Sequence, residues 1–498
     1  MRITDANTMR KVDEWCIDEL KIPSVVLMEN AAFKVAGNVD KNMNNIVIVC
    51  GTGNNGGDGL AVARQLFKKN KNIAVFLIGN IEKMSSDCKV NYNILKNMKL
   101  NIINIKNSED IFILKEAIKK SELIIDAIFG TGLNRKIEGI FSEVISKIND
   151  SKKYILSIDA PSGLNSDNGL IMGNCIRANK TVSFEAYKVG FLQYGNDVYI
   201  GEVVIEDIGI PEFVLEKFCD NKFILDESII KNGIVRRNKY SHKGNYGKVT
   251  IFAGSTGYSG AAYISTQAAV KTGSGLVTLC TYKQIQNILS EKLVEAMTIS
   301  YDEEERINNA IEKSSVIAIG PGMGNNKFTL DMLKKIICTS KVPIVIDADG
   351  INVLKDNISL LANKKVPIVI TPHLGEMSRL TNISVEGIKN NRIEIAQNFA
   401  RKYDVIVLLK GYNTVITDGK YTAINSTGNS AMASGGMGDC LTGMIASFIG
   451  QQYHPLKAAC MAAYIHGYCG ENLSQKMFSV TASDVLNEIP YAIKTFIN

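Results

Sequence analysis

The sequence predicts an α/β protein of two domains, each with a sheet flanked by helices. At 498 residues the chain is long enough for two or more domains, since a domain typically has about 100–200 residues. Short apolar runs rich in β-branched residues alternate with helical stretches. This alternation breaks near residues 209–211 and resumes at residue 248, which indicates a second domain.

Four apolar runs of the first half are predicted to be buried parallel strands, because they are short, β-branched and almost continuously apolar. They are residues 45–50 (NIVIVC), 72–79 (NIAVFLIG), 122–129 (ELIIDAIF) and 154–159 (YILSID). Helical segments such as residues 60–69 lie between them. This βαβ series predicts a doubly wound sheet.

Six further runs predict strands in the second half. They are residues 248–253, 275–281, 316–320, 343–347, 367–371 and 404–410, again with helical segments between them. The polar stretch 212–248 separates the two series, so the boundary is expected near residue 220 and the domains at 1–218 and 222–496. The halves share a fold class but no repeated motif, which indicates a fusion of two different domains.

Composition excludes several functional classes. The net charge of +6 is small for this length and the charges are interleaved, so no nucleic-acid or membrane partner is predicted. Ten cysteines without a Cys-x-x-Cys pair, and four histidines without zinc-ligand spacing, favour a reduced cytoplasmic protein. No apolar run reaches the ~18 residues that would suggest a membrane span.

A glycine-rich loop follows the first predicted strand. Residues 51–59 (GTGNNGGDG) lead into a helix, where free backbone N–H groups at the helix start can bind an anion. Without a Gly-Lys-Ser/Thr sequence the loop is not a Walker motif. A tight turn, or a phosphate loop for an unknown ligand, explains the same residues.

Two further loops leave predicted strand ends, at residues 126–135 (DAIFGTGLNR) and 159–165 (DAPSGLN). Ligands of open parallel sheets bind outside the carboxyl ends of the strands, so these loops are expected to meet. Asn55, Asp126, Asp159 and Ser162 would then supply oxygen ligands, which suit a hard cation. Alternatively, the two aspartates only cap the helices that follow.

The three loops together resemble the NAD(P)H-hydrate epimerase family, and the resemblance covers most of residues 1–215. It implies a Rossmann-like domain that interconverts the R and S forms of NADH or NADPH hydrated at C6 of the nicotinamide ring. It also implies a K⁺ ion bound by Asn55, Asp126 and Ser162. The substrate-binding residues implied are Asn54, Asn55, Gly56, Gly57, Asp58, Gly130, Thr131, Gly132, Leu133, Asn134, Arg135, Lys136 and Asp159. Asp159 is the predicted acid/base group, since a carboxylate within reach of the ring can carry the proton.

The strongest feature of the second half is residues 428–439 (GNSAMASGGMGD), which precede an apolar helix at 441–449. Glycines at a helix start form an anion hole of N–H groups that can steady a transferring phosphoryl group. Asp439 could accept the proton of an attacking hydroxyl group. The alternative is a helix end merely capped by an aspartate.

Other strand-end loops of this half carry His373 and Lys410. A histidine in a turn is as often structural as catalytic, whereas a lysine beside glycine at a strand end is well placed to bind phosphate. The loops with these features are residues 254–262 (GSTGYSGAA), 320–324 (GPGMG), 347–350 (DADG), 371–376 (TPHLGE) and 410–414 (KGYNT).

These loops and the GGMGD turn resemble the ADP/ATP-dependent NAD(P)H-hydrate dehydratases of the ribokinase-like superfamily, over about residues 225–495. The resemblance implies that ADP or ATP with Mg²⁺ phosphorylates the C6 hydroxyl, with Asp439 as base, and that phosphate then leaves. Residues implied to contact the hydrated coenzyme are Ala261, Gly322, Gly324, His373 and Asp439. Those implied to bind the nucleotide are Lys410, Gly411, Tyr412, Asn413, Thr414, Asn429, Ser434, Gly435, Gly436, Met437 and Gly438. The sequence departs from the family at Ser430-Ala431, where proline-glycine is expected.

Two functions are therefore compatible with the sequence. The first is a bifunctional repair enzyme that acts on small molecules, the hydrated coenzyme and ADP or ATP, and that forms a homo-oligomer. The second is a kinase for a small alcohol fused to a nucleotide-binding sensor or scaffold. The apolar segment at residues 22–28 (IPSVVLM) fits a subunit interface or a core position equally.

Overall fold

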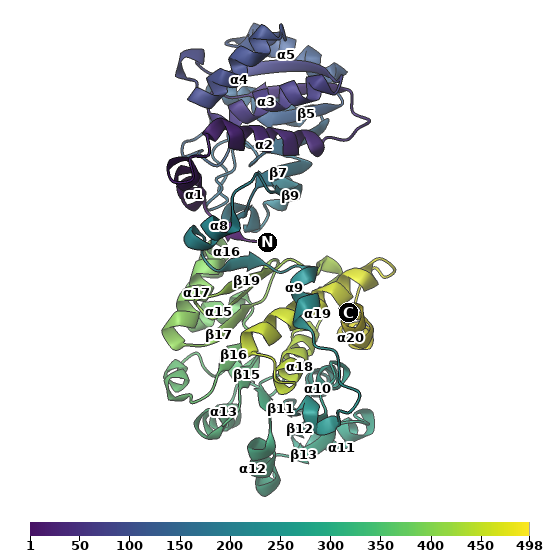
Figure 1. Ribbon diagram of the computed structural model, residues 1–498. Coiled ribbons are helices and arrows are strands. Elements are labelled where there is room, and N and C mark those ends of the chain that lie inside the picture. Colours follow the sequence, from purple (N-terminus) through teal and green to yellow (C-terminus); the bar gives the residue numbers. More distant parts are fainter. Residues whose placement is uncertain (498) are drawn as a thin grey trace. The chain divides into compact units, whose positions relative to one another are not determined.

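A computed structural model describes residues 1–497, and in it the chain forms two compact units (Figure 1). The N-terminal unit is Met1–Asp220, and the C-terminal unit starts at Asn221. Each unit has its own sheet, with helices packed against it. The α/β class expected from the sequence is therefore confirmed.

The N-terminal unit contains a seven-stranded sheet in which all neighbouring strands are parallel. Its order is β4 (Ile102–Ile105), β3 (Asn72–Ile78), β2 (Asn45–Cys50), β5 (Leu123–Ala127), β6 (Tyr154–Ile158), β7 (Lys180–Phe184) and β9 (Glu202–Glu206). A separate two-stranded sheet pairs β1 (Ile3–Thr4) with β8 (Tyr187–Lys188) in parallel.

Both faces of this sheet are buried, as a doubly wound sheet requires. Ile46 and Ile48 of β2 belong to one apolar core, whereas Val47 and Val49 belong to another. Helices of the first core are α1 (Ala6–Asp18), α2 (Ser24–Gly37), α3 (Asn54–Lys68), α4 (Ser86–Asn97) and α8 (Glu212–Phe218). Those of the second are α5 (Ser108–Lys120) and α6 (Gly139–Asp150), and the short α7 (Asp197–Ile200) precedes β9.

The C-terminal unit contains a ten-stranded sheet, in which β18 is antiparallel to both neighbours and all other pairs are parallel. Its order is β10 (Lys222–Ile224), β19 (Thr422–Asn425), β18 (Thr414–Thr417), β17 (Ile406–Leu409), β16 (Ile368–Ile370), β15 (Ile344–Ile346), β14 (Val316–Ile319), β11 (Lys248–Phe252), β12 (Leu276–Thr281) and β13 (Met297–Ser300).

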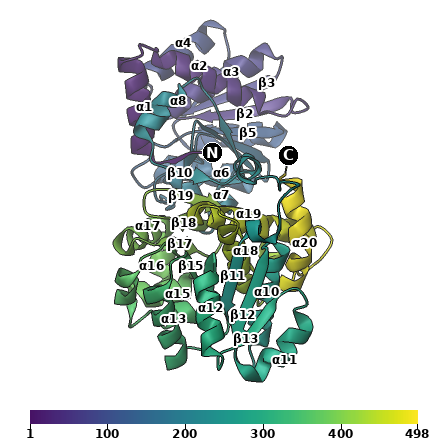
Figure 2. The same cartoon turned by 60° about the horizontal axis from the view of Figure 1, so that its bottom comes forward.

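One large apolar core lies against the sheet of the C-terminal unit, and most of its helical residues come from α10 (Ser259–Lys271), α18 (Met437–Gly450), α19 (Pro455–Ser474) and α20 (Ala482–Thr495). Helix α18 packs against β11, β14 and β15, and α19 packs against β16, β17, β18 and β19; both helices are labelled in Figure 2. The other helices are α9 (Glu227–Gly233), α11 (Lys283–Lys292), α12 (Glu304–Lys313), α13 (Lys327–Thr339), α14 (Asp349–Asn352), α15 (Leu374–Thr381), α16 (Val385–Asn390) and α17 (Arg392–Tyr403).

Every cysteine carries a free thiol, and all except Cys338 are buried. Among residues 1–497, none of the helices has the length and apolar character needed to cross a bilayer.

Candidate active sites

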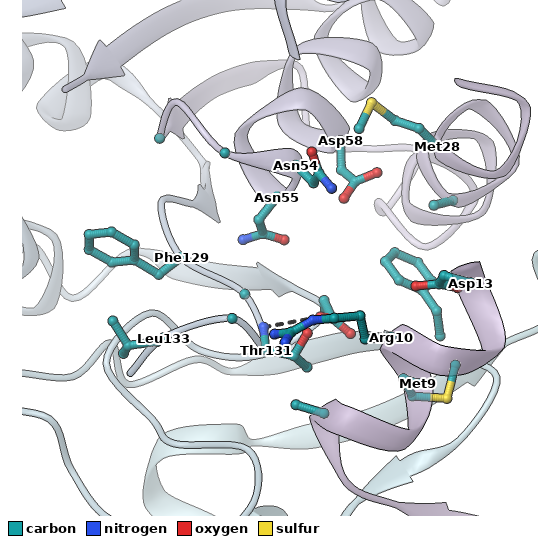
Figure 3. Close-up of a pocket in the computed structure, with 18 of the residues that line it drawn as sticks. Met9, Arg10, Asp13, Met28, Asn54, Asn55, Asp58, Phe129, Thr131 and Leu133 are labelled. Atoms are coloured by element: carbon teal, nitrogen blue, oxygen red, sulfur yellow. Dashed lines mark hydrogen bonds between the residues drawn. The ribbon is translucent and has the colours of Figure 1, made fainter. Parts of the chain in front are cut away.

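A cavity of about 650 Å³ lies where β2, β5 and β6 end in the N-terminal unit (Figure 3). The loops after these strands line it, together with α1, α2 and the start of α3. The residues of its lining that the sequence singles out are Asn54, Asn55, Asp58, Gly130, Thr131, Gly132, Leu133, Asn134, Arg135 and Asp159. Three other predicted substrate-binding residues, Gly56, Gly57 and the exposed Lys136, are not part of the lining.

Gly56 and Gly57 have a packing role instead. A Cβ atom on Gly56 would lie 1.9 Å from the carbonyl oxygen of Gly51, and one on Gly57 would lie 2.8 Å from Met28. Only glycine permits this close turn into α3. Gly53 precedes the helix without a side-chain cap, so the first N–H groups of α3 remain free for an anion.

Asp159 lies at the carboxyl end of β6 with a φ of 62°, a left-handed conformation that is uncommon outside glycine. Its carboxylate accepts hydrogen bonds from the Thr131 N–H at 3.3 Å and from the Ser183 hydroxyl at 3.3 Å. The ammonium of Lys188 lies 3.5 Å from Asp159 Oδ1. Asp159 therefore sits among donors, facing the cavity.

Asp126 is fully buried at the end of β5 and has a different role. It accepts hydrogen bonds from the hydroxyl of Ser157 at 2.8 Å and from the N–H and hydroxyl of Ser162 at 2.9 and 2.5 Å. Burial raises the pKa of Asp126, against the effect of these hydrogen bonds. Ser162 in turn accepts from the Phe129 N–H at 2.8 Å, which fixes the loop beside the cavity.

Asn55 is buried, and neither its side-chain oxygen nor its side-chain nitrogen has a hydrogen-bond partner within residues 1–497. A Cβ atom on Gly130 would lie 3.2 Å from both the Asn55 amide and Asp159 Oδ2, so all three residues meet. An unpaired buried amide is costly to a fold, which indicates a binding role for Asn55.

In the C-terminal unit a buried ion pair lies between the central strands and α18. Lys410 follows β17, and its ammonium donates to Oδ1 of Asp347 at 2.8 Å. The hydroxyls of Thr371 and Thr442 also donate to this carboxylate, each at 2.7 Å. Burial disfavours both charges, but each partner holds the other ionised: the pKa of Asp347 is lowered and that of Lys410 is raised.

Asp439 lies next to this pair, in the first turn of α18. It is half-buried, and Gly438 before it approaches Lys410 so closely that a Cβ atom would lie 3.2 Å from the ammonium. Burial raises the pKa of Asp439 to about 7, with help from the negative charges of Asp347 and Asp349 and against that of Lys410. Such a carboxyl group can exchange a proton near neutral pH.

The loop after β14 and the start of α10 come together beside this centre. Gly322 has a φ of 64°, and a Cβ atom there would lie 2.9 Å from both Ala261 and Tyr258. The Gly324 N–H donates to Asp349 at 2.8 Å, which ties this loop to the strand end that carries Asp347. The predicted substrate-binding residues Ala261, Gly322 and Gly324 thus belong to one assembly of loops.

His373 caps α15, as a turn histidine would. Its Nδ1 accepts from the N–H groups of Gly375 at 2.9 Å and Glu376 at 3.3 Å, and Glu376 accepts from the His373 N–H at 2.8 Å. The side chain remains about half exposed. Burial, then the charges of Lys410 and Arg379, lower its pKa, so the ring is neutral at neutral pH.

The predicted nucleotide-binding residues occupy two loops. Those at 410–414 form the turn between β17 and β18, where Arg392 donates to the carbonyls of Tyr412 and Asn413. Those at 429–438 lead into α18 through the left-handed Gly436. At Ser430-Ala431 the chain forms a 3₁₀ turn, with the Asn429 side chain accepting from the Ala431 N–H. The helix start is therefore intact without proline-glycine.

Comparison with known proteins agrees with this geometry. The family model for NAD(P)H-hydrate dehydratase matches residues 249–491, and the model for the YjeF-related protein N-terminus matches residues 24–190. The bifunctional NAD(P)H-hydrate repair enzyme of Moorella thermoacetica is 35% identical over 514 residues, which cover 99% of this chain and 97% of the relative. The same enzyme of Dictyoglomus turgidum is also 35% identical, with 99% and 98% covered.

The chain belongs to the bifunctional NAD(P)H-hydrate repair enzyme family. It is thus an enzyme that repairs hydrated coenzyme, with an epimerase half and a dehydratase half. The alternative function, a kinase for a small alcohol fused to a sensor, is not supported, because relatives matched over the whole chain are repair enzymes.

Solved structures resemble the dehydratase half. A ribokinase-like superfamily protein of Enterococcus faecalis aligns with a TM-score of 0.52 at 28% identity, covering 56% of this chain and 97% of that protein. The ADP/ATP-dependent NAD(P)H-hydrate dehydratase of Bacillus subtilis, co-crystallised with ATP and Mg²⁺, aligns with a TM-score of 0.50 at 28% identity, covering 55% and 98%. The ribokinase-like fold expected for the C-terminal half of the repair enzyme is confirmed.

Sequence reasoning missed several charged residues of the epimerase cavity. Arg10 and Asp13 of α1, Asp87 of α4 and Lys188 of β8 line it, although no glycine-rich loop carries them. The pairing of Thr4 with Lys188 in the β1–β8 sheet brings the N-terminal segment to this cavity. In the dehydratase half, Asp347 belongs to the loop at residues 347–350, but the sequence indicated no role for it.

Proposed function

We propose that Asp439 is the general base of the dehydratase half, residues 222–496, and that it activates the C6 hydroxyl of the hydrated coenzyme. The observation that carries this proposal is the half-buried carboxyl group at the start of α18, with a pKa raised to about 7. A base is most effective when its pKa lies near the working pH. The adjacent N–H groups of α18 and the ammonium of Lys410 suit a phosphoryl group.

The proposed reaction has two steps. The C6 hydroxyl gives its proton to Asp439 while its oxygen attacks the terminal phosphorus of ADP or ATP, and AMP or ADP leaves. The lone pair of the ring nitrogen then expels phosphate from C6, and loss of a proton from C5 restores the double bond of NADH or NADPH. Lys410 and the N–H groups of α18 would offset the charge that develops during phosphoryl transfer.

We assign binding roles to the loops around this centre. Ala261, Gly322, Gly324 and His373 would contact the hydrated coenzyme, whereas residues 410–414 and 429–438 would hold the nucleotide. In support, these loops follow β11, β14, β16, β17 and β19, and ligands of parallel sheets bind beyond strand ends. The neutral ring of His373 would add no charge beside the nicotinamide.

Magnesium would accompany the nucleotide. Mg²⁺ is usually bound through substrate phosphates and one or two carboxylates, so the phosphate groups of ADP or ATP would carry the ion into this site. When bound, Mg²⁺ neutralises charge on the phosphoryl group.

For the epimerase half, residues 1–218, we propose that the hydrated coenzyme binds in the 650 Å³ cavity. Its phosphates would meet the free N–H groups of α3 and the loop that carries Arg135, while Asp159 would face the nicotinamide ring. Asp159 is the proposed proton acceptor, a role that suits a carboxylate surrounded by an N–H, a hydroxyl and an ammonium group.

A potassium ion is proposed beside Asn55, Asp126 and Ser162. The residues fit a hard monovalent cation, because Asn55 has an unpaired buried carbonyl oxygen and burial raises the pKa of Asp126. When bound, the ion would neutralise the buried charge of Asp126. If so, exchanging K⁺ for Li⁺ should lower the melting temperature of wild type but not of D126N. Equal melting of wild type in both salts would contradict the assignment.

We further propose that the enzyme is a cytoplasmic homo-oligomer. Free thiols suit a reducing compartment, and Val26 and Phe33 of α2 are 43% and 62% exposed, which suits a subunit contact. Sedimentation of wild type and F33D would test the contact, with a smaller particle expected for F33D. Identical sedimentation would contradict it.

The central test measures the products of the dehydratase reaction and the effect of replacing Asp439. Wild type with the S hydrate and ADP should release one inorganic phosphate for each NADH or NADPH formed. The absorbance of the reduced coenzyme measures its formation. D439A should bind ADP but lose turnover by at least about 100-fold, the usual contribution of a general base. D331A, which changes an exposed aspartate of α13, is the matched control and should keep activity. A stable phosphorylated product, or an active D439A protein, would contradict the proposal.

A further inference from the structure

Epimerisation at C6 demands more than one proton-transfer event. If the hydroxyl leaves with the help of the ring nitrogen, the C6–O bond breaks, the nitrogen lone pair forms an N1=C6 double bond, and the oxygen must collect a proton to depart as water. When water adds to the other face, the C6–O bond forms again and a proton is released. A site that performs both steps benefits from one protonated and one ionised group.

Asp159 is suited to the acceptor role. The Lys188 side chain is 98% buried, and its ammonium donates to the carbonyl of Phe184 at 3.1 Å and lies 3.5 Å from Asp159 Oδ1. The Thr131 N–H and the Ser183 hydroxyl also donate to this carboxylate, each at 3.3 Å. These contacts hold the Asp159 carboxylate in place beside the cavity.

Within the described residues, the carboxyl group of Asp13 lies in an environment without such donors. It lines the same cavity from α1, it is half-buried, and among residues 1–497 its carboxyl group forms no hydrogen bond or salt bridge. Figure 3 shows it on the helix at the side of the cavity opposite Phe129 and Leu133. Burial raises its pKa to about 6, with the charge of Asp159 adding to this effect and that of Lys188 opposing it.

Backbone pairing between β1 and β8 explains why Asp13 lies at the cavity. Thr4 of β1 pairs with Lys188 of β8, and α1 starts two residues after Thr4. Asp5 caps the helix by accepting from the Thr8 N–H at 2.7 Å, while Met9, Val12 and Cys16 are buried in the core. The helix is therefore held in a fixed orientation that turns Asp13 toward the cavity.

We propose that Asp13 is the proton donor of the epimerase site and acts with Asp159 as acceptor, while Lys188 is a positioning residue that holds the Asp159 carboxylate. This inference rests on the proposed epimerase function. The proton moves from Asp13 to the departing hydroxyl, and the proton of the water that adds next goes to Asp159. Transfer of that proton back to Asp13 through solvent completes the cycle.

Other charged groups surround Asp13 and shape its titration. They are Arg10 and Glu14 on its own helix, Asp58 on α3, Asp87 on α4, Asp159 after β6, and Glu185 and Lys188 near β8. Asp58 also lines the cavity, and burial raises its pKa, with Asp159 and Asp13 adding to the shift. It therefore competes with Asp13 for the donor role and belongs in the test.

The pH dependence of epimerisation separates these groups in the full-length enzyme. Wild-type kcat/KM should fall as the pH rises through about 6, because the active form of Asp13 is protonated. D13N should lose about 100-fold or more in rate, together with this limb of the profile. K188M should move the limb to higher pH, because Lys188 lowers the pKa of Asp13. E14Q keeps the acid itself and removes only an exposed charge that raises the pKa of Asp13, so the rate should persist and the limb should remain at slightly lower pH.

Two controls keep each outcome decisive. Fluorescence of the single tryptophan, Trp15, two residues beyond Asp13, reports whether α1 remains folded. Dehydration of the S form by D13N should match wild type. If folded D13N retains the limb, or if D58N alone removes it, the donor is not Asp13. If wild type itself fails to equilibrate the epimers, the proposed epimerase function fails instead.

Discussion

The ammonium of Lys410 and the carboxylate of Asp347 lie 2.8 Å apart at the start of α18, and Asp439, the proposed base, shares their surroundings. The pair brings one positive and one negative charge next to Asp439, with opposite effects on its pKa. Thr371 and Thr442 complete the hydrogen bonds of Asp347. This arrangement leads to the first three predictions.

Dehydration should require the ionised form of Asp439. With a pKa near 7, kcat/KM should rise by about tenfold for each pH unit below 7 and level off above it. D349N should move this limb to lower pH, because the charge of Asp349 helps to raise the pKa of Asp439. A flat profile between pH 5 and 8 would contradict the assignment of the base.

Loss of the buried pair should destabilise the C-terminal unit. D347A leaves the largely buried Lys410 ammonium without its hydrogen-bonded carboxylate, although Glu376 and Asp439 remain nearby, so the loss should approach but not exceed the ~3–5 kcal/mol that breaking a fully buried pair costs. The control K364M removes a surface pair at 2.9 Å with Asp404, which is 94% exposed, and should cost less than about 1 kcal/mol. Urea unfolding followed by circular dichroism measures both. Equal losses in the two proteins would contradict the burial argument.

The same pair predicts acid sensitivity. The pKa of Asp347 is lowered in the folded protein, so its contribution is complete above the ordinary value of 3.8 and is lost as the pH falls through the lowered pKa. Unfolding between pH 5 and pH 2 should therefore be steeper for wild type than for D347A. Parallel curves would show that the pair does not contribute.

The turn into α3 should accept a side chain at one glycine and reject it at another. G56A places a Cβ atom 1.9 Å from the Gly51 carbonyl, so the turn must open and the N-terminal unit should lose several kcal/mol, roughly 3 or more. G53A meets no atom within 4 Å and should unfold near the wild-type midpoint. If thermal unfolding does not distinguish G56A from G53A, the close turn is not essential.

A side chain at Gly438 should lower activity, whereas one at Gly56 should lower stability. A Cβ atom on Gly438 lies 3.2 Å from the Lys410 ammonium, which Asp347 holds in place, whereas one on Gly435 meets nothing within 4 Å. G438A should lower kcat for dehydration by about tenfold or more, since small displacements of catalytic groups are costly. G435A changes the same nucleotide-binding loop without a clash and should lower kcat less than G438A does. Equal activity of the two proteins would argue against a fixed Lys410.

The apolar central strands were predicted from the sequence, whereas shorter or more polar strands were not. Residues 45–50 form β2 as expected, because a strand buried on both faces is almost entirely apolar. The sequence showed no signal for β7, whose buried Thr181 and Ser183 interrupt the apolar run, or for the partly exposed β9. Strand β10 was missed inside the polar stretch 212–248, since three residues are too few to show a period.

The functional sites, too, were predicted from the sequence only in part. Loops rich in glycine identified the cavity around Asn55 and the turn before Asp439 because close backbone approach demands specific residues there. Asp13 and Lys188 stand in ordinary helix and strand patterns, and only the pairing of Thr4 with Lys188, 184 residues away, brings them together. Such a long-range contact leaves no local periodic signal.

The most direct measurement uses one mixture of R and S hydrates with wild type, D439A and D159N, following each epimer and the reduced coenzyme with ADP or ATP present and absent. Wild type should convert both epimers completely when nucleotide is present. D439A should equilibrate the epimers without forming reduced coenzyme, and D159N should consume the S form and leave the R form behind. Formation of reduced coenzyme by D439A at the wild-type rate would contradict the central claim that Asp439 is the base of the dehydration.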